Sequence, residues 1–406
     1  MADEQAPMGM GEDTPLVRYL NDLLAQAALR RASDLHWEPQ ERSVRVRLRI
    51  DGVLHELPPA HASLRERLAS RVKLLARLDI AERRMPQDGR LAWTTPQGQA
   101  LHLRVSTLPT LHGEKLVIRL LDHAQVPLDL GALGCEGAAL AQLQQALAQP
   151  HGMLLFTGPT GSGKTQSLYA CLQQLNHPQR NIATVEDPCE IRLPGLNQVN
   201  VHDKPGLDFA TVLRALMRQD PDVIMVGEIR DHETAQIALQ AAQTGHLVLS
   251  SLHTPDAPGA LIRLRHMGMP GYNIAGTLTL VVAQRLVRRL CPHCRRPQRL
   301  EAERLRQAGA ADDAHLQAWH AAGQTVWTPV GCGQCQHGYR GRVGIFQVMP
   351  VGTALQTLLL QEAGLQALRE QATREGMPGL RAAGLWRVLD GTSALEEVVS
   401  QTALPT

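Results

Sequence analysis

The chain has 406 residues, of which 44% are hydrophobic and 20% are charged, values that suit two or three globular domains of roughly 150 residues each. The formal net charge is only +2 at pH 7 and aromatic residues make up 3%, which argues against a protein that binds nucleic acid through bulk charge and stacked aromatic side chains. No apolar run approaches the roughly 18 residues of a membrane-spanning helix and the acidic start lacks a signal-peptide pattern, so we expect a cytoplasmic protein.

The first part of the chain predicts a loose tail and a small α+β domain. Residues 1–13 are small, polar and acidic, whereas leucines recur at helical spacing after residue 14. The expected helices and strands lie at 14–32, 44–50, 64–80, 101–106 and 115–121, the second of them a strand in which apolar residues alternate with arginine. We place the domain at 14–121, and Pro127, Gly131 and Gly134 mark residues 122–134 as a linker.

From Gly152 onward short apolar strands alternate with helical segments. The expected strands lie at 153–157, 182–186, 223–226 and 247–250. This alternation is typical of a mainly parallel sheet with helices on both faces. We place this second domain at 135–406, with an insertion at 286–342 and C-terminal helices at 351–400 that break at Gly376, Gly384 and Gly391.

The strongest motif follows the first of these strands. Residues 158–165 match G-x-x-x-x-G-K-[ST] and consist of Gly158, Pro159, Thr160, Gly161, Ser162, Gly163, Lys164 and Thr165. The glycines let backbone N–H groups surround phosphate oxygens, Lys164 supplies a cation for the β- and γ-phosphates, and Thr165 can ligate Mg²⁺. The following helix directs its positive end toward the anion. The sequence therefore predicts a site for ATP and Mg²⁺.

Three other strand ends supply candidates for the chemistry. Glu228 follows the strand at 223–226, and ligands bind at the carboxyl ends of parallel strands, so Glu228 is our candidate catalytic carboxylate. Glu186 and Glu190, with Asp187, form a candidate second acidic wall for Mg²⁺ or water. His253 follows the strand at 247–250 and is a candidate sensor of the γ-phosphate, although a histidine at a strand end is more often structural.

Four of the seven cysteines form two CxxC pairs, Cys291 with Cys294 and Cys332 with Cys335. In a reducing compartment this pattern indicates a metal more than disulfides or a redox pair, and four thiolates suit a closed, structural Zn²⁺ site. His293 and His337 are spare ligands. Residues 295–331 between the pairs predict a small helical insertion at 301–321. The arginines nearby favour a solvated face over a phosphate or lipid contact; they are Arg285, Arg288, Arg289, Arg295 and Arg296.

The motifs, in this order, resemble those of the type II/IV secretion ATPase superfamily. They are the phosphate loop at 158–165, the aspartate-rich box TVEDPCE at 184–190, the acidic strand DVIMVGEIRD at 222–231 and the histidine box GHLVLSSLHT at 245–254. The family's second N-terminal domain is similar to ASDLHWEP at 32–39, RVRLRIDGVL at 45–54, LDIAERRMPQDGR at 78–90 and RVSTLPTLHGEK at 104–115. The cysteine pairs, followed by GYRGRVGIFQVM at 338–349, resemble the subfamily that extends pili or drives type II secretion.

The resemblance implies an α/β fold, with a RecA-like P-loop ATPase domain that has a mainly parallel sheet, preceded by a smaller α+β, PAS-like domain. It implies a homo-hexamer that hydrolyses ATP to drive assembly of a type II secretion pseudopilus or a type IV pilus, associated peripherally with the inner membrane through a platform protein. It also implies nucleotide contacts from Arg104, Arg119, Arg214 and Arg218, the last two lying four apart on one helix face. Many such motors carry a further N-terminal domain that grips a membrane partner, and we expect a short form without it.

Two other functions compete with this interpretation. One is a RecA-like translocase of nucleic acid, which DNA-stimulated ATP hydrolysis would reveal; the near-neutral charge and the few aromatic residues argue against it. The other is an assembly scaffold that binds ATP without turnover. The presence of Lys164, Thr165 and Glu228 argues against the scaffold.

Overall fold

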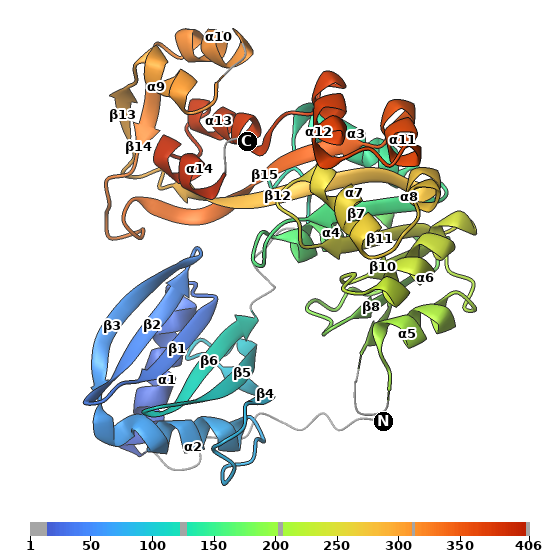
Figure 1. Ribbon diagram of the computed structural model, residues 1–406. Helices are drawn as coiled ribbons and strands as arrows, with labels where there is room; N and C mark the ends of the chain where they lie inside the picture. The colour runs from blue at the N-terminus through green and yellow to red at the C-terminus, as the bar shows by residue number, and fades with distance from the viewer. Residues whose placement is uncertain (1–13, 122–127, 202–205, 311–312, 403–406) are drawn as a thin grey trace. The chain divides into compact units, whose positions relative to one another are not determined.

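The computed structural model describes residues 14–121, 128–201, 206–310 and 313–402, which fall into two compact units (Figure 1). The first unit ends within the expected linker and the second contains the remainder of the chain. The expected tail at 1–13 and residues 122–127 of the expected linker lie outside the described residues.

The first unit is a six-stranded antiparallel sheet with its helices against one face. The strands lie in the order β3-β2-β1-β6-β5-β4. Their bounds are β1 (Asp34–Pro39), β2 (Ser43–Ile50), β3 (Val53–His61), β4 (Gln87–Thr94), β5 (Ala100–Thr110) and β6 (Gly113–Leu121), and the helices are α1 (Pro15–Leu29), η1 (Ala62–Leu64) and α2 (Arg65–Leu75). The expected strands at 44–50, 101–106 and 115–121 are confirmed, whereas β1, β3 and β4 were not expected as strands.

Alternation of side chains explains why helices cover only one face of this sheet. In β2 every second residue is buried, and Val46 and Leu48 pack with Trp37 of β1 and with the leucines of α1. The arginines between them lie on the opposite face, because successive side chains of a strand point to opposite faces. That second face is therefore charged.

The second unit contains a seven-stranded sheet in the order β15-β12-β7-β11-β10-β8-β9. The strands are β7 (Gly152–Thr157), β8 (Ile182–Glu186), β9 (Asn197–Asn200), β10 (Val223–Val226), β11 (Leu247–Leu252), β12 (Leu278–Leu290) and β15 (Tyr339–Pro350). Only β15 is antiparallel to its neighbour, so the expected mainly parallel sheet is confirmed.

Helices cover both faces of this sheet (Figure 1). One face packs against α5 (Phe209–Leu216), α6 (His232–Gln243), α7 (Ala257–His266), α8 (Gly271–Thr277), α11 (Thr353–Leu360) and α12 (Leu365–Arg374). The other face packs against α3 (Gly137–Leu147) and α4 (Lys164–Leu175). The strands are apolar on both sides, as expected for parallel strands buried between helices.

The cysteine-containing insertion is shorter than the expected 286–342. Strand β12 continues to Leu290 and β15 begins at Tyr339, because the two strands pair over most of their length. Between them lie an antiparallel pair of strands, β13 (Arg296–Arg299) and β14 (Thr325–Thr328), and the helices that connect this pair, α9 (Ala302–Gln307) and α10 (Asp313–Ala321).

The C-terminal helices are α11 and α12, followed by α13 (Leu380–Leu389) and α14 (Leu395–Gln401). The expected break at Gly384 is wrong, since this glycine lies inside α13. A Cβ atom there would come within 2.6 Å of Val398 Cγ1 and 2.9 Å of Ile345 Cδ1. Close packing of α13, and not a turn, therefore explains this glycine.

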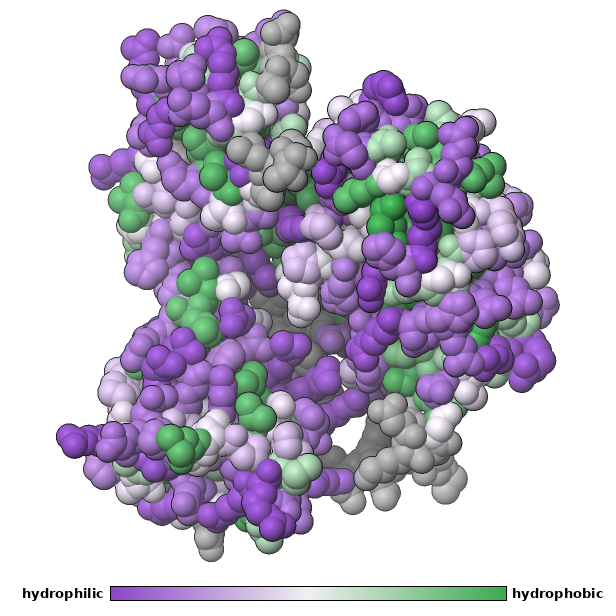
Figure 2. Space-filling model, in the orientation of Figure 1, coloured by the Kyte–Doolittle hydropathy of each residue, from purple (hydrophilic) through white to green (hydrophobic). Residues whose placement is uncertain are grey.

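Hydrophilic side chains predominate on the face drawn in Figure 2, and the apolar ones there form small separate groups. Within the described parts of the chain, no helix has both the length and the apolar character needed to cross a membrane.

Candidate functional site

The phosphate loop lies at the carboxyl end of β7 and leads directly into α4. Gly163 has a φ of +89°, and a Cβ atom on it would come within 2.8 Å of Gln284 Nε2. A Cβ atom on Gly158 would come within 2.6 Å of both Gln284 O and Ser162 Oγ. Both positions therefore require glycine, because β12 lies directly behind the loop.

Lys164, the first residue of α4, is buried and points back into the loop. Its Nζ donates to the carbonyl of Gly158 at 2.8 Å and to that of Pro159 at 3.2 Å. Burial lowers the pKa of Lys164 to about 8, an effect that the charge of Glu228 opposes and that of Arg285 increases. The ammonium thus lacks a carboxylate partner within the described hydrogen bonds, which suits a site for an anion.

The rest of the loop fits the same ligand. Ser162 Oγ is buried and has no hydrogen-bond partner among the described residues, and a phosphate oxygen would provide one. Pro159, Thr160, Gly161 and Thr165 are exposed. The Thr165 hydroxyl is therefore open to a Mg²⁺ ion bound with the phosphates.

Glu228 lies just beyond β10, and its carboxylate accepts hydrogen bonds from two side chains. Arg230 donates to Oε1, and His253 Nε2, from the end of β11, lies 3.2 Å from Oε2. Burial acts to raise the pKa of Glu228, but the hydrogen bond and charge of Arg230, with a smaller effect from His253, hold it below its usual value. Glu228 is therefore an ionised carboxylate at neutral pH, within electrostatic reach of Lys164.

The two candidates on the aspartate-rich box occupy different surroundings. Glu186 is buried at the end of β8, where it accepts hydrogen bonds from Tyr169, from Thr184 Oγ1 at 2.6 Å and from Gln198 Nε2 at 3.2 Å. Glu190 is half-buried in the loop that follows. The hydrogen bonds therefore join Glu228 to His253, whereas Glu186 bonds to side chains of α4, β8 and β9.

Two functional candidates escaped the sequence analysis. Arg230 bonds to Glu228 and also lies 3.9 Å from Asp187, so it links the acidic strand to the aspartate-rich box. Arg285 was assigned to a solvated face, but it is half-buried and its guanidinium donates to Gln284 O at 2.9 Å and to Pro255 O at 2.5 Å. Arg230 lies inside the acidic-strand motif at 222–231, but the motif does not show its partners. Arg285 has no local sequence signal, because pairing of β12 with β7 brings it to the phosphate loop.

The four arginines implied by the resemblance lie in two places. Arg214 lies on α5 and pairs with Glu233 of α6, whereas Arg218 lies beyond the end of α5, so the expectation of one helix for both is wrong by about half a turn. Arg218 donates to Arg214 O at 2.9 Å. Capping of α5 at Met217 explains the difference.

Arg104 and Arg119 lie directly opposite each other on β5 and β6 of the first unit. Arg90 lies opposite Arg104 on the next strand, β4. Arg119 also donates to Asp34 Oδ1 at 2.9 Å. Like charges in directly opposite positions of a sheet are destabilising, and the carboxylate of Asp34 offsets the charge of Arg119.

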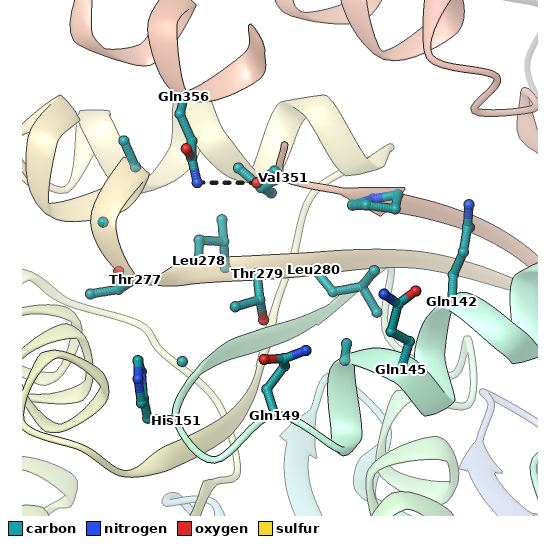
Figure 3. Close-up of a pocket in the computed structure, with 15 residues that line it drawn as sticks. Gln142, Gln145, Gln149, His151, Thr277, Leu278, Thr279, Leu280, Val351 and Gln356 are labelled. Atoms are coloured by element: carbon teal, nitrogen blue, oxygen red, sulfur yellow. Dashed lines mark hydrogen bonds between the residues drawn. The ribbon is translucent and has the colours of Figure 1, made fainter. Parts of the chain in front are cut away.

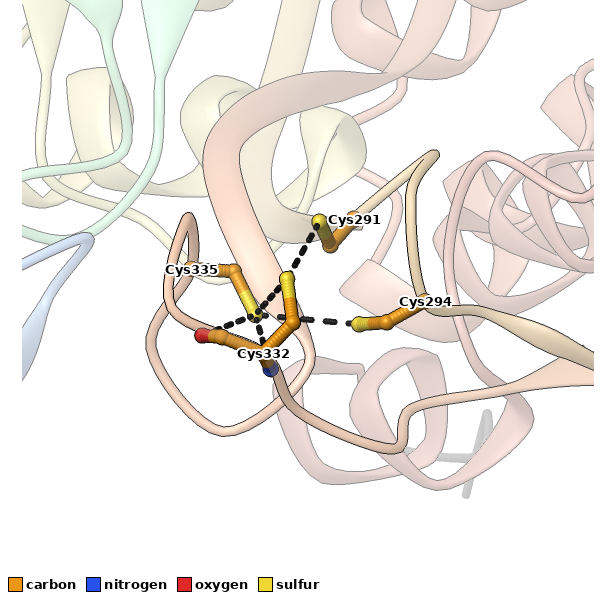
Figure 4. A group of neighbouring side chains, drawn as sticks. All are labelled: Cys291, Cys294, Cys332 and Cys335. Carbon is orange, nitrogen blue, oxygen red and sulfur yellow. Dashed lines mark hydrogen bonds between the residues drawn. The ribbon is translucent and has the colours of Figure 1, made fainter.

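The four cysteine thiols converge at the end of β12 and the start of β15 (Figure 4). Their sulfur atoms lie 3.9 Å apart for Cys291 and Cys332, 3.7 Å for Cys294 and Cys335, and 3.6 Å for Cys332 and Cys335. Zn–S bonds of about 2.3 Å in a regular tetrahedron would place the sulfurs about 3.8 Å apart. These three separations suit Zn²⁺, and all four sulfur atoms lie within 4.8 Å of one another.

A pocket of about 320 Å³ lies at the opposite end of β7 from the phosphate loop (Figure 3). It is lined by Gln142, Gln145 and Gln149 of the α3 region, by His151, and by the first residues of β12. No acidic residue, lysine or arginine lines it. It therefore lacks the charges that a nucleoside triphosphate and its metal require.

Known proteins resemble this chain over most of its length. The family model described as type II/IV secretion system protein matches residues 10–400. The type IV pilus assembly ATPase PilB of Myxococcus xanthus is 48% identical over 394 residues, which cover 97% of this chain and 69% of that protein. The type II secretion system ATPase E of Vibrio cholerae is 46% identical over 392 residues, which cover 96% of this chain and 76% of that protein.

A solved structure shares the fold. The X-ray structure of the Legionella pneumophila ATPase DotB has a TM-score of 0.67 to this chain, with 18% sequence identity and coverage of 98% of both chains.

Proposed function

Because the chain belongs to the type II/IV secretion system protein family and is an ATPase, we propose that it powers assembly of a type II secretion pseudopilus or a type IV pilus. The observation that carries the proposal is the juxtaposition of a phosphate loop with an ionised carboxylate. Lys164 and Glu228 lie within electrostatic reach of each other. They follow the carboxyl ends of β7 and β10, which are separated in the sheet by one strand, β11. Nucleotide-driven motors need this combination of an anion cradle and a base.

Each site residue has a proposed role in hydrolysis. The backbone of residues 158–163 and the Lys164 ammonium hold the β- and γ-phosphates, and Thr165 ligates Mg²⁺, which neutralises phosphate charge when it is bound. Glu228 orients the attacking water and accepts its proton. His253, hydrogen-bonded to Glu228, senses the γ-phosphate, while Glu186 and Glu190 form the second acidic wall.

The arginines supply charge compensation. In this proposal Arg214 and Arg218 contact phosphates or link neighbouring active sites of a homo-hexamer. The first unit closes onto the ATPase domain and brings Arg104 and Arg119 to the phosphates. A cation near a γ-phosphate favours the closed state only while ATP is bound, and such a difference is what shifts a conformational equilibrium.

Two structural assignments accompany this function. We assign Zn²⁺ to Cys291, Cys294, Cys332 and Cys335 as a closed site that stabilises the insertion. The sulfur–sulfur distances support this assignment. So do two backbone hydrogen bonds of 3.3 Å, from Gly331 N to Cys294 Sγ and from Cys332 N to Cys335 Sγ. The first unit, with its helices on one face of an antiparallel sheet, is assigned as the PAS-like domain that precedes a RecA-like core.

The remaining proposals concern where the motor acts. We assign it to the cytoplasmic face of the inner membrane, peripherally bound through a platform protein and pilus or secretion components. The relatives named as a type IV pilus assembly ATPase and a type II secretion system ATPase support the link to pilus or secretion components. Stimulation of hydrolysis by DNA would contradict it in favour of a translocase.

Two substitutions and one control test the catalytic assignment. Lys164→Ala should abolish ATP binding and hydrolysis. Glu228→Gln should bind ATP but hydrolyse it about 10²- to 10⁴-fold more slowly, because it removes the base and leaves the cradle. Asp222→Asn is the matched control, since Asp222 lies at the other end of β10 and accepts a hydrogen bond from Asn181 N at 2.7 Å.

Steady-state phosphate release with each variant decides the question. Hydrolysis by Asp222→Asn should equal that of the wild type. Normal hydrolysis by Glu228→Gln would show that the base is another residue, Glu186 or Glu190. Normal hydrolysis by Lys164→Ala would refute the assignment of the phosphate loop as the ATP site.

A further inference from the structure

Tyr169 connects the phosphate-loop helix to the aspartate-rich box through its hydroxyl group. It lies on α4, the helix that Lys164 begins, and is completely buried. Its hydroxyl donates to Glu186 and accepts from the backbone N–H groups of Glu190 and Ile191, each at 3.1 Å. One side-chain oxygen thus bonds to the carboxylate of Glu186 at the end of β8 and to the backbone of two residues at the end of the box and just beyond it.

The single proton of the hydroxyl has a fixed destination. Burial and the negative charge of Glu186 both raise the pKa of Tyr169, so the phenol stays protonated. Thr184 and Gln198 donate to the other oxygen of Glu186 and hold the carboxylate in place. A hydroxyl has one proton and two lone pairs. Because the hydroxyl donates its hydrogen bond to Glu186, both lone pairs of its oxygen remain to accept from the N–H groups of Glu190 and Ile191.

The same loop is held from β9 on its other side. Gln198 donates to Ile191 O at 2.9 Å and accepts from Leu193 N at 2.8 Å. Asn200 Oδ1 accepts from Cys189 N at 2.6 Å. The β9 contacts fix the loop to the sheet, whereas the Tyr169 hydroxyl fixes it to the helix that carries the phosphate loop.

We propose that Tyr169 is a positioning residue for ATP hydrolysis, which sets the backbone at Glu190 relative to the phosphate loop. Within the second acidic wall, Glu186 also orients the hydroxyl of Tyr169, and Glu190 is the member of the wall that Tyr169 positions. The inference rests on the proposed function, because it needs Glu190 to take part in hydrolysis. It assigns a role to a hydroxyl that no sequence motif identified.

Removal of one oxygen atom is the direct test. Tyr169→Phe keeps the ring and its packing but leaves two backbone N–H groups without their acceptor. Misplacement of a reacting group by about 1 Å can cost about 100-fold in rate, so we expect kcat to fall by about 10- to 100-fold while KM for ATP changes by less than about threefold. Tyr339→Phe is the matched control, since Tyr339 is a buried tyrosine of β15 whose ring packs under Arg288.

A double-mutant cycle separates positioning from a general structural effect. Glu190→Gln should itself lower kcat. Adding Tyr169→Phe should lower kcat little further, because both substitutions remove the same contribution, that of the correctly placed Glu190 carboxylate. Backbone hydrogen exchange at Glu190 and Ile191 should be slow in the wild type and faster in Tyr169→Phe. The wild-type exchange rates test the hydrogen bonds even where the variant does not fold.

Several results would overturn the inference. These are wild-type kcat in Tyr169→Phe or in Glu190→Gln, multiplicative losses in the double variant, an equal loss in Tyr339→Phe, or unprotected amides at Glu190 and Ile191 in the wild type. Hydrolysis by Lys164→Ala, measured beside them, reports on the proposed function. If Lys164→Ala is inactive and any of these results is found, the phosphate-loop site stands and the positioning role fails. Wild-type kcat in Glu190→Gln would in addition remove Glu190 from the second acidic wall.

Discussion

Raising the pH should weaken ATP binding through the titration of Lys164. In the free protein burial holds the pKa of this lysine at about 8, against a usual value of 10.5. Bound phosphates would replace the carbonyls of Gly158 and Pro159 as acceptors, and their negative charge favours the ammonium form. The pKa is therefore higher in the complex than in the free protein. Affinity is fully present below about pH 8 and is lost as the pH rises from there toward the pKa of the complex.

The size of the effect follows from the two pKa values. Recovery from about 8 to 10.5 is about 2.5 units, which at about 1.4 kcal/mol per unit is about 3 kcal/mol, or about 300-fold in Kd. Half of the free protein carries a neutral Lys164 at pH 8, so binding should take up about 0.5 proton there, about 0.1 at pH 7 and about 0.9 at pH 9.

Titration calorimetry in buffers of different ionisation enthalpy measures this uptake. A non-hydrolysable ATP analogue with Mg²⁺ avoids turnover, and work above about pH 7 keeps the γ-phosphate ionised. Lys164→Arg is the matched control, because a guanidinium stays protonated throughout this range. Arg285→Gln should move the window to higher pH and Glu228→Gln to lower pH, since their charges lower and raise the pKa of Lys164 respectively.

Two results would refute this reasoning. One is an affinity that stays constant from about pH 7 to about pH 9.5, with no net proton uptake. The other is the same uptake in Lys164→Arg as in the wild type. Either would mean that the ammonium is already stabilised in the free protein, or that the phosphates do not contact it.

Further predictions concern metal, domain closure and stability. Purified protein should contain about one Zn²⁺ per chain, and Cys332→Ser should destabilise the insertion more than it changes nucleotide affinity; freshly purified, unchelated protein without zinc would contradict this. Arg104→Ala and Arg119→Ala should each lower ATP hydrolysis strongly and abolish ATP-dependent compaction in small-angle scattering, whereas wild-type values in both would make them plain surface residues. Lys73→Met should destabilise the first unit by about 3–5 kcal/mol, because it leaves the buried Glu114 carboxylate, now 2.9 Å from Nζ, without its cation. Thermal unfolding should show partial recovery when Glu114→Leu is added, and equal stability of Lys73→Met and wild type would contradict the estimate of this ion pair.

The sequence alone determined the features that depend on a short stretch of chain. The phosphate loop needs glycines at set positions after an apolar strand, and the spacing within 158–165 provides them. The alternation in β2 and the apolar runs of β7, β8, β10 and β11 come from burial on one or both faces, which leaves a local pattern. The two CxxC pairs likewise predicted the group of thiols that the structure brings together.

Tertiary structure decided what depends on contacts between distant segments. β12 reaches the phosphate loop through parallel pairing with β7, and only this pairing turns Arg285 from a solvated arginine into a neighbour of Lys164. The hydroxyl of Tyr169 acquires its partners only because β8 and the loop after it lie beside α4. The row of Arg90, Arg104 and Arg119 likewise exists only in the register of three strands. Strand order and register are set by the summed packing of the whole core, and no local pattern records them.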